Sequence, residues 1–294
     1  MGGYLDVMLN GIMVGSIYSL LACGFVVVFK CTRVFNFSFP AIVIVGAYVS
    51  YSAATIFKIN PYLSVFMSMI FCFLLGFVIE RLFLRRMIGE PVFSIVVLTI
   101  GLSEVLNGIA GLVWGNDERI FPVFFSNSII TFGDLSIPSL YIYISVSSLI
   151  VFSLLVAYFR MSPFGIGMRA VASQQDWASL YGIDPRSVFA LSWGIAGAVG
   201  AISGVFLSMI LSVNLSLQNV VIRAFSGAVL GGMDSIVGAL LGGLFIGISE
   251  SFIGGIVDPY IGGGGKEVVA YFILVIILMI KPYGLFGTEE VDRA

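Results

Sequence analysis

The side chains that could carry out chemistry are few in this chain, and histidine is missing altogether. Among 294 residues there are 14 lysines and arginines, 16 aspartates and glutamates, and no histidine. This composition excludes serine–histidine hydrolysis, cysteine–histidine nucleophiles and most zinc sites. Cys23, Cys31 and Cys72 lack the C-x-x-C spacing and lie in or beside apolar stretches, so we interpret them as small buried hydrophobes. The chain is predicted not to be an enzyme.

A glycine-rich stretch, Gly262 to Lys266, has part of the pattern of a phosphate-binding loop. The pattern G-x-x-x-x-G-K-[ST] fails at two positions, because Tyr260 stands at the first glycine and Glu267 follows the lysine. The net charge of −2, with no basic patch, gives nothing that would neutralise phosphates. We therefore expect this chain itself to bind neither ATP nor nucleic acid.

Ionisable residues inside apolar stretches are the strongest candidates for a functional role, since burying a charge in a membrane is unfavourable. Glu104 has Asn107 one helical turn away, Glu250 lies in another apolar stretch, and Arg223 lies in a third. Arg223 could pair with either glutamate as a structural ion pair. Alternatively, these four residues line a solute path, or the two glutamates relay ions in an ion-coupled secondary transporter.

Composition identifies the elements that must position these residues as membrane helices. The chain is 59% hydrophobic and 10% charged, and its charges cluster between long apolar runs. Most of these runs approach the roughly 20 residues that a spanning helix needs. The fold class is predicted to be an all-α polytopic bundle, residues 1–294 forming a single transmembrane domain. The eight strong runs cover about 11–29, 41–57, 62–84, 92–114, 139–159, 188–213, 236–257 and 267–280.

The basic residues predict the orientation of the bundle, because they favour cytoplasmic loops. With the N-terminus outside, Lys58 and Arg119 are external, and a loop at about 115–138, with a candidate hairpin over 121–137, is external too. The cytoplasmic basic residues are then Lys30, Arg33, Arg81, Arg85, Arg86, Arg160, Arg169 and Arg186.

Eight crossings alone would leave the C-terminus outside, against the same rule. A short or re-entrant helix near 218–234, rich in small residues and lined by protein, would place the C-terminus in the cytoplasm. Several G-x-x-x-G pairs, including Gly11 with Gly15 and Gly243 with Gly247, predict close helix contacts.

The longest polar segment of the chain runs from Arg160 to Arg186, between two apolar runs. Its pattern predicts two short helices, the second with a capping box formed by Ser173 and Asp176. Asp184 and Pro185 then supply an N-cap and a first-turn proline for the next membrane helix. The segment is either an ordinary surface loop or a docking element for a soluble partner.

The stretch SPFGIGMRAVASQQDWASLYGID, residues 162–184, resembles the cytoplasmic coupling loop of permeases in the branched-chain amino acid (LIV-type) family of ABC importers. That family carries F/M-G-x-x-x-R-A-x-A followed by A-x-L-x-G-I. Further stretches of the chain agree with the family in order and spacing, so the resemblance covers essentially all 294 residues. They are Phe35 to Phe37, Ala228 to Ser235 and Lys281 to Gly287.

The resemblance implies a non-catalytic permease subunit that moves amino acids or related small organic solutes across the bacterial inner membrane. The implied partners are a related permease subunit or a second copy of this chain, two ATPase subunits that bind ATP and magnesium, and an extracytoplasmic solute-binding protein. The residues implied to couple to the ATPase are Gly167, Arg169, Ala170, Ala172, Asp176, Ala178, Leu180 and Gly182.

Near its start the chain departs from a pattern common in that family, I-N-F-A-H-G-E. Phe39 stands at the histidine position and Ala41 at the acid position, where Pro40 interrupts the helix. Asn36, Ser38 and Phe39 are therefore candidates for a less polar solute path. The alternative, that this corner only packs against a neighbouring helix, stays open.

Overall fold

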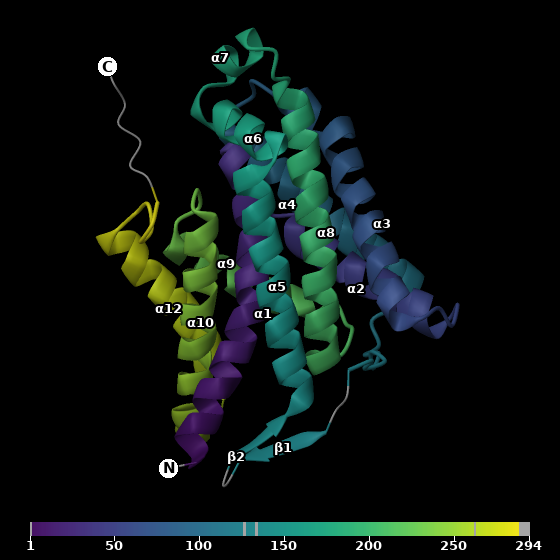
Figure 1. Cartoon of the computed structure of the whole chain (residues 1–294), viewed down its shortest axis with the longest axis vertical. Helices are drawn as coiled ribbons and strands as arrows, with labels where there is room; N and C mark the ends of the chain where they lie inside the picture. Colours follow the sequence, from purple (N-terminus) through teal and green to yellow (C-terminus); the bar gives the residue numbers. More distant parts are fainter. Residues whose placement is uncertain (1, 126–127, 133–134, 262, 288–294) are drawn as a thin grey trace. The chain divides into compact units, whose positions relative to one another are not determined.

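The computed structural model describes residues 2–125, 128–132, 135–261 and 263–287, and these residues are mostly helical (Figure 1). Their backbone contacts divide the chain into two compact units. Unit 1 comprises Met1–Val26, Phe125–Phe152 and Arg223–Ala294, and unit 2 comprises Val27–Phe124 and Ser153–Ile222. Helices α1, α5 and α9 each contribute residues to both units.

Six helices in the described part of the chain are long and apolar enough to cross a membrane. The spans are Asp6–Thr32 in α1 (Gly2–Thr32), Pro61–Met87 in α3 (Pro61–Leu82) with its 3-10 extension η1 (Leu84–Met87), Val92–Trp114 (α4), Ser139–Met161 (α5), Pro185–Leu211 (α8) and Ile236–Tyr260 in α10 (Ile236–Ile256) with α11 (Asp258–Ile261).

The other two predicted runs form shorter helices, so the expected count of eight strong spans is not confirmed. Helix α2 (Phe39–Thr55) has 17 residues and α12 (Gly265–Ile280) has 16. At 1.5 Å per residue such helices reach only about 25 Å, less than the roughly 30 Å hydrocarbon core. The expected run, 41–57, is itself only 17 residues long, because it lies between the break before Pro40 and the turn at Asn60–Pro61.

The short helix predicted near 218–234 is present as α9 (Leu217–Gly231), with 15 residues. Most of its side chains are buried, as expected of a segment lined by protein. Within unit 1, Gly227 and Gly231 of α9 meet Gly242 and Gly238 of α10 backbone to backbone. The small residues there allow a contact that any larger side chain would prevent.

Unit 1 also joins the first part of α1 to α10 through the glycines that the sequence pattern singled out. A Cβ added at Gly11 would lie 2.7 Å from the Ile248 Cα, and one at Gly15 would lie 2.8 Å from the Leu244 Cα. The Ser19 hydroxyl donates a hydrogen bond to the Leu240 carbonyl oxygen at 2.8 Å. The predicted close-contact faces are confirmed for this helix pair.

The candidate hairpin in the loop before α5 is also present in unit 1. Strand β1 (Ile129–Phe132) pairs antiparallel with β2 (Leu135–Pro138), with Ile129 opposite Pro138. Residues 133–134, between the two strands, lie outside the described residues.

The core of unit 2 is α8, with α2 and α3 packed against it. A side chain at Gly197 of α8 would overlap the Cys72 carbonyl of α3, and one at Gly76 would overlap the Trp193 carbonyl. Because later residues of α3 meet earlier residues of α8, the two helices are antiparallel. The end of α3 therefore lies beside the start of α8, where α6 (Pro163–Ser173) and α7 (Gln175–Leu180) also lie (Figure 1).

Candidate functional site

The segment predicted to couple to a partner folds as two short helices, α6 and α7, in unit 2. Helix α6 begins at Pro163, and the Ser162 hydroxyl accepts a hydrogen bond from the Gly165 amide at 3.0 Å. Such a cap satisfies one of the free amides of the first turn. This cap and the first-turn proline place the start of α6 at Pro163.

The predicted capping box of Ser173 with Asp176 is wrong. Ser173 is the last residue of α6, and the N-cap of α7 is Gln174, which makes no side-chain cap hydrogen bond. Asp176 instead lies in the first turn of α7, where a carboxylate interacts favourably with the helix dipole. The S-x-x-D spacing is present, but the first helix runs on through Ser173 and removes it from the cap position.

Arg169 and Gly165 fix α6 against the end of α5. The Phe159 carbonyl would normally accept from the amide four residues later, but that residue is Pro163, which has no N–H. The Arg169 Nη1 donates to this carbonyl oxygen at 2.6 Å, and Gly165 is close enough that a Cβ there would overlap it. Arg169 thus supplies the hydrogen bond that proline removes and sets the position of α6.

Helix α7 presents an apolar face that nothing in unit 2 covers. Trp177 is 59% exposed, Leu180 79% and Tyr181, the C-cap residue, 81%, while Ala178 is buried. Gly182 has a φ of +81°, which lets the chain turn back toward α8 immediately after this face. Three large apolar side chains at i, i+3 and i+4 form one surface on such a helix.

The residues implied to couple to an ATPase therefore lie in one continuous structure with two kinds of environment. Gly167 and Ala178 are buried, and Ala170 and Ala172 are half-buried. Four others are exposed: Arg169, Asp176, Leu180 and Gly182. The buried group can only support the shape of the segment, whereas the exposed group is available for contact.

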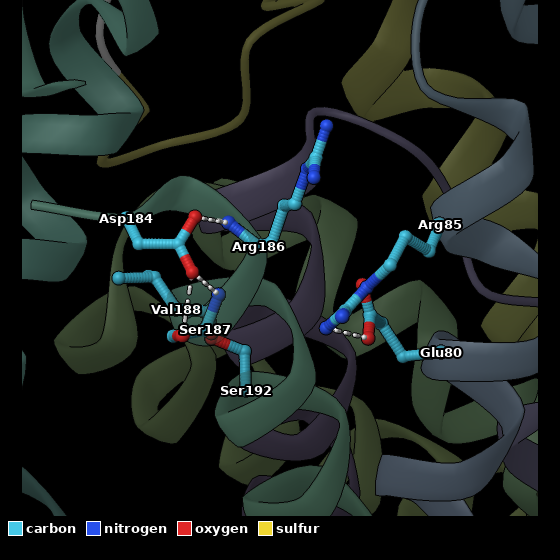
Figure 2. A network of polar contacts seen from close by, with 7 residues as sticks. All are labelled: Glu80, Arg85, Asp184, Arg186, Ser187, Val188 and Ser192. Carbon is cyan, nitrogen blue, oxygen red and sulfur yellow. Dashed lines mark hydrogen bonds and ion pairs between the residues drawn. The ribbon is translucent and has the colours of Figure 1, made fainter.

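The ends of α3 and α8 beside this segment carry a polar network (Figure 2). Asp184 caps α8 as predicted, accepting from the Arg186 amide at 3.1 Å and from the Ser187 hydroxyl at 2.7 Å. The Ser187 hydroxyl is the main reason that the pKa of Asp184 lies below its ordinary value. At the end of α3, the Arg85 Nη2 lies 3.2 Å from the Glu80 Oε2, and the Glu80 side chain is 1% exposed.

The corner before α2 is closed by its own side chains. The Asn36 Oδ1 accepts from the Ser38 amide at 3.0 Å and from the Ser38 hydroxyl at 2.7 Å. Phe39 is fully buried, and its ring lies 3.0 Å from where a Cβ of Gly200 in α8 would be. Phe39 therefore has the environment of a packing residue between α2 and α8.

The two candidate residues on α4, Asn107 and Glu104, have different surroundings. The Asn107 Nδ2 donates to the Gln218 Oε1 of α9 at 2.6 Å, within unit 2. Glu104 is exposed on α4 and forms no ion pair with any described residue.

Arg223 and Glu250 meet inside unit 1, as one of the two sequence alternatives predicted. The Arg223 Nε lies 3.4 Å from the Glu250 Oε1, and both side chains are buried. The Tyr18 hydroxyl donates to the Glu250 Oε2 at 2.8 Å, and the Arg223 Nη1 lies 3.5 Å from the Glu267 Oε1. The cluster joins α1, α9, α10 and α12, and sequence reasoning missed Tyr18 and Glu267.

Two of the stretches that carry the family resemblance, residues 228–235 and 281–287, are far apart in the sequence but are neighbours in unit 1. The amides of Leu285 and Phe286 donate to the carbonyls of Leu230 and Gly231, at 2.8 and 3.1 Å. These carbonyls are at the end of α9 and have no partner within the helix. A side chain at Gly284, which has a φ of +79°, would overlap the Val229 carbonyl, and one at Gly232 would overlap the backbone of Gly287. The segment after α12 thus caps α9.

Comparison with known proteins identifies the family of this chain. The family model described as branched-chain amino acid transport system / permease component matches residues 7–280. The chain is 31% identical to the high-affinity branched-chain amino acid transport system permease protein BraD of Pseudomonas aeruginosa, over 99% of this chain and 98% of that protein. It is 29% identical to the corresponding permease protein LivH of Escherichia coli, over 99% and 97%.

A solved structure resembles the fold at much lower sequence identity. It is PsaBC from Streptococcus pneumoniae in complex with a Fab, at a TM-score of 0.53 and 11% identity, covering 96% of this chain and 93% of that one. With its six candidate spans, the chain is a multi-pass protein of the inner membrane. The expected family is confirmed, and the chain belongs to the permease components of branched-chain amino acid transport systems.

Proposed function

We propose that this chain is the non-catalytic permease subunit of an ATP-driven importer for amino acids or related small organic solutes. It would act with a related permease or a second copy of itself, with two ATPase subunits, and with an extracytoplasmic solute-binding protein. ATP and magnesium would be bound by the ATPase subunits. The relatives in branched-chain amino acid transport systems support this assignment.

The observation that carries the proposal is the exposed apolar face of α7, together with the hydrogen-bonded attachment of α6 to α5. Trp177, Leu180 and Tyr181 stand out from the segment, and the Arg169 hydrogen bond to the end of α5 holds α6 in place. An apolar patch on a short helix fits a groove in a soluble partner. Because α6 is held in this way, movement of the ATPase against α7 would be transmitted to α5 and α8.

An orientation with the N-terminus outside and the C-terminus in the cytoplasm agrees with the way unit 2 distributes charge. The end of α3 and the start of α8 carry Arg81, Arg85 and Arg186, and α6 carries Arg169. Lys58 and Arg119 belong to loops at the opposite ends of these helices. We infer that α7 faces the cytoplasm, where an ATPase would be.

The candidates for the solute path remain Asn36, Ser38, Phe39, Glu104, Asn107, Arg223 and Glu250. Among them Glu104 is the strongest candidate for the solute path, because an exposed carboxylate within an apolar helix needs protein or water beside it. An ion-coupled secondary transporter using Glu104 and Glu250 is not favoured. The relatives are permease components, and Glu250 is held by Arg223 and Tyr18.

The coupling role is tested by Leu180→Asp in the assembled complex in proteoliposomes. We expect normal membrane insertion but about tenfold or greater loss of ATP-dependent uptake, because a charge would replace a central apolar contact. Ser179→Asp is the matched control, since it adds the same charge to an exposed polar position of α7. Full uptake and solute-stimulated ATPase activity in the Leu180 variant would contradict the docking role.

A further inference from the structure

Unit 2 contains a cavity of about 200 Å³ at the end where α3 stops and α8 begins. Its walls come from the end of α1, the turn between α3 and α4, the first residue of α7, and α8. The apolar part of the lining includes Val34, Met87, Ile88 and Phe189. A mostly apolar cavity with a few polar groups is the usual form of a small-molecule site.

Two buried side chains in this lining carry polar atoms without a partner. Glu80 is 1% exposed and Trp193 3% exposed, and both line the cavity. Among the described residues nothing hydrogen-bonds the Glu80 Oε1 or the Trp193 Nε1. Arg85 occupies only the other carboxylate oxygen of Glu80, as Figure 2 shows. Leaving the Glu80 oxygen unpaired is unfavourable, so a ligand that donates a hydrogen bond to it gains affinity.

The charge of the lining decides which ligand fits. The charged residues that line the cavity are Glu80 and Glu90, both acidic, whereas the nearby Arg85 and Arg81 do not belong to the lining. A cation is therefore favoured over an anion. The indole of Trp193 adds a flat aromatic wall, which also attracts cations.

We propose that this cavity binds a primary ammonium group attached to a small apolar body. The ammonium would donate to the free oxygen of Glu80, and the apolar body would lie among Met87, Ile88 and Phe189. A soluble amine and the ammonium of a phosphatidylethanolamine headgroup share this chemistry. Because Gln175 of α7 belongs to the lining, an occupant also touches the helix whose exposed face we assign to coupling.

The first arm of the test uses the full chain purified in detergent and three probes of one shape. These are isoamylamine, isoamyl alcohol and isovalerate, which are cationic, neutral and anionic at neutral pH. We expect a measurable dissociation constant for the amine by calorimetry, and at least about tenfold weaker binding of the other two. Glu80→Gln should weaken the amine by about tenfold, because the charged acceptor is lost.

Two further variants make this arm decisive. Ile88→Trp fills the cavity from its half-exposed rim and should abolish amine binding even if the Glu80 variant does not fold. Asp117→Asn removes an exposed carboxylate outside the lining and should leave binding unchanged. Equal binding of amine and alcohol, or amine binding that survives both cavity variants, would overturn the proposal.

The second arm separates the two sources of the ammonium. Wild-type and Glu80→Gln chains are placed in nanodiscs of phosphatidylethanolamine or phosphatidylglycerol, and their thermal unfolding is compared. Stabilisation by phosphatidylethanolamine in the wild type alone would assign the site to the lipid headgroup. With no such effect and no amine binding in the first arm, the proposal fails. Both arms use the chain without its ATPase partners, so their outcome is independent of the coupling experiment.

Discussion

At the scale of single residues, Glu104 and Glu250 have the same chemistry and opposite surroundings. Glu250 accepts from Tyr18 and lies beside Arg223, deep in unit 1. Glu104 is exposed on α4, and the structure gives it no ion pair among the described residues. Removing one partner of a buried pair is strongly unfavourable, whereas an exposed carboxylate can be replaced with little effect. The two residues therefore contribute differently to stability.

We expect Glu250→Ala to lower the free energy of unfolding by about 3–5 kcal/mol, because Arg223 and Tyr18 lose the carboxylate between them. Glu250→Gln should lie between Ala and wild type, since an amide oxygen still accepts from Tyr18. Thermal or denaturant unfolding of the purified chain in detergent measures both. Glu104→Ala is the matched control, with an expected change within about 0.5 kcal/mol. Equal losses in both Ala variants would show that the cluster does not stabilise the fold.

At the scale of elements, glycine decides which helices approach one another. Gly197 of α8 meets the backbone of α3, whereas a Cβ at Gly108 of α4 would have nothing within 4 Å. Both residues lie within apolar helices, and the sequence gives no reason to treat them differently. Packing alone distinguishes a required glycine from a tolerated one.

Gly197→Val should destabilise the chain by about 1–3 kcal/mol or more, because the new side chain overlaps the Cys72 carbonyl and separates α3 from α8. Unfolding in detergent, or the yield of monodisperse protein, reports the loss. Gly108→Val adds the same atoms to an open face and should change stability by less than about 0.5 kcal/mol. A larger loss at Gly108 than at Gly197 would contradict this account of the core.

At the scale of the whole molecule, the proposed orientation in the membrane rests on charge instead of on packing. In unit 2, the basic residues at the turn after α3 and Arg169 of α6 belong to the end that carries α7. Asn116 lies in the loop after α4, at the opposite end of the unit. The proposed coupling role requires the α7 end to be cytoplasmic.

Single cysteines at Ser173 and Asn116 should therefore react with an impermeant thiol reagent from opposite sides of the membrane. Both positions are exposed, and the three native cysteines, which are buried, are replaced beforehand. The Ser173 position should label only in inside-out vesicles and the Asn116 position only in intact cells. Labelling of both from one side would remove the orientation and, with it, the coupling proposal.

The sequence by itself determined the features that depend on neighbours along the chain. Composition identified membrane helices, and Asp184 with Pro185 marked the start of α8 because a cap acts within one helical turn. The short α9 and the hairpin of β1 and β2 followed from charge parity and from alternation. The family followed from motifs that each lie within a few consecutive residues.

Only the tertiary structure decided the contacts between residues far apart in the chain. The sequence allowed Arg223 two carboxylate partners, and packing selected Glu250, with Tyr18 and Glu267 joining it. The sequence marked Arg169 as a docking residue, yet this side chain replaces the hydrogen bond that Pro163 removes from α5. It did not indicate that the segment after α12 caps α9, because that pairing joins backbone groups, which leave no pattern in the side chains.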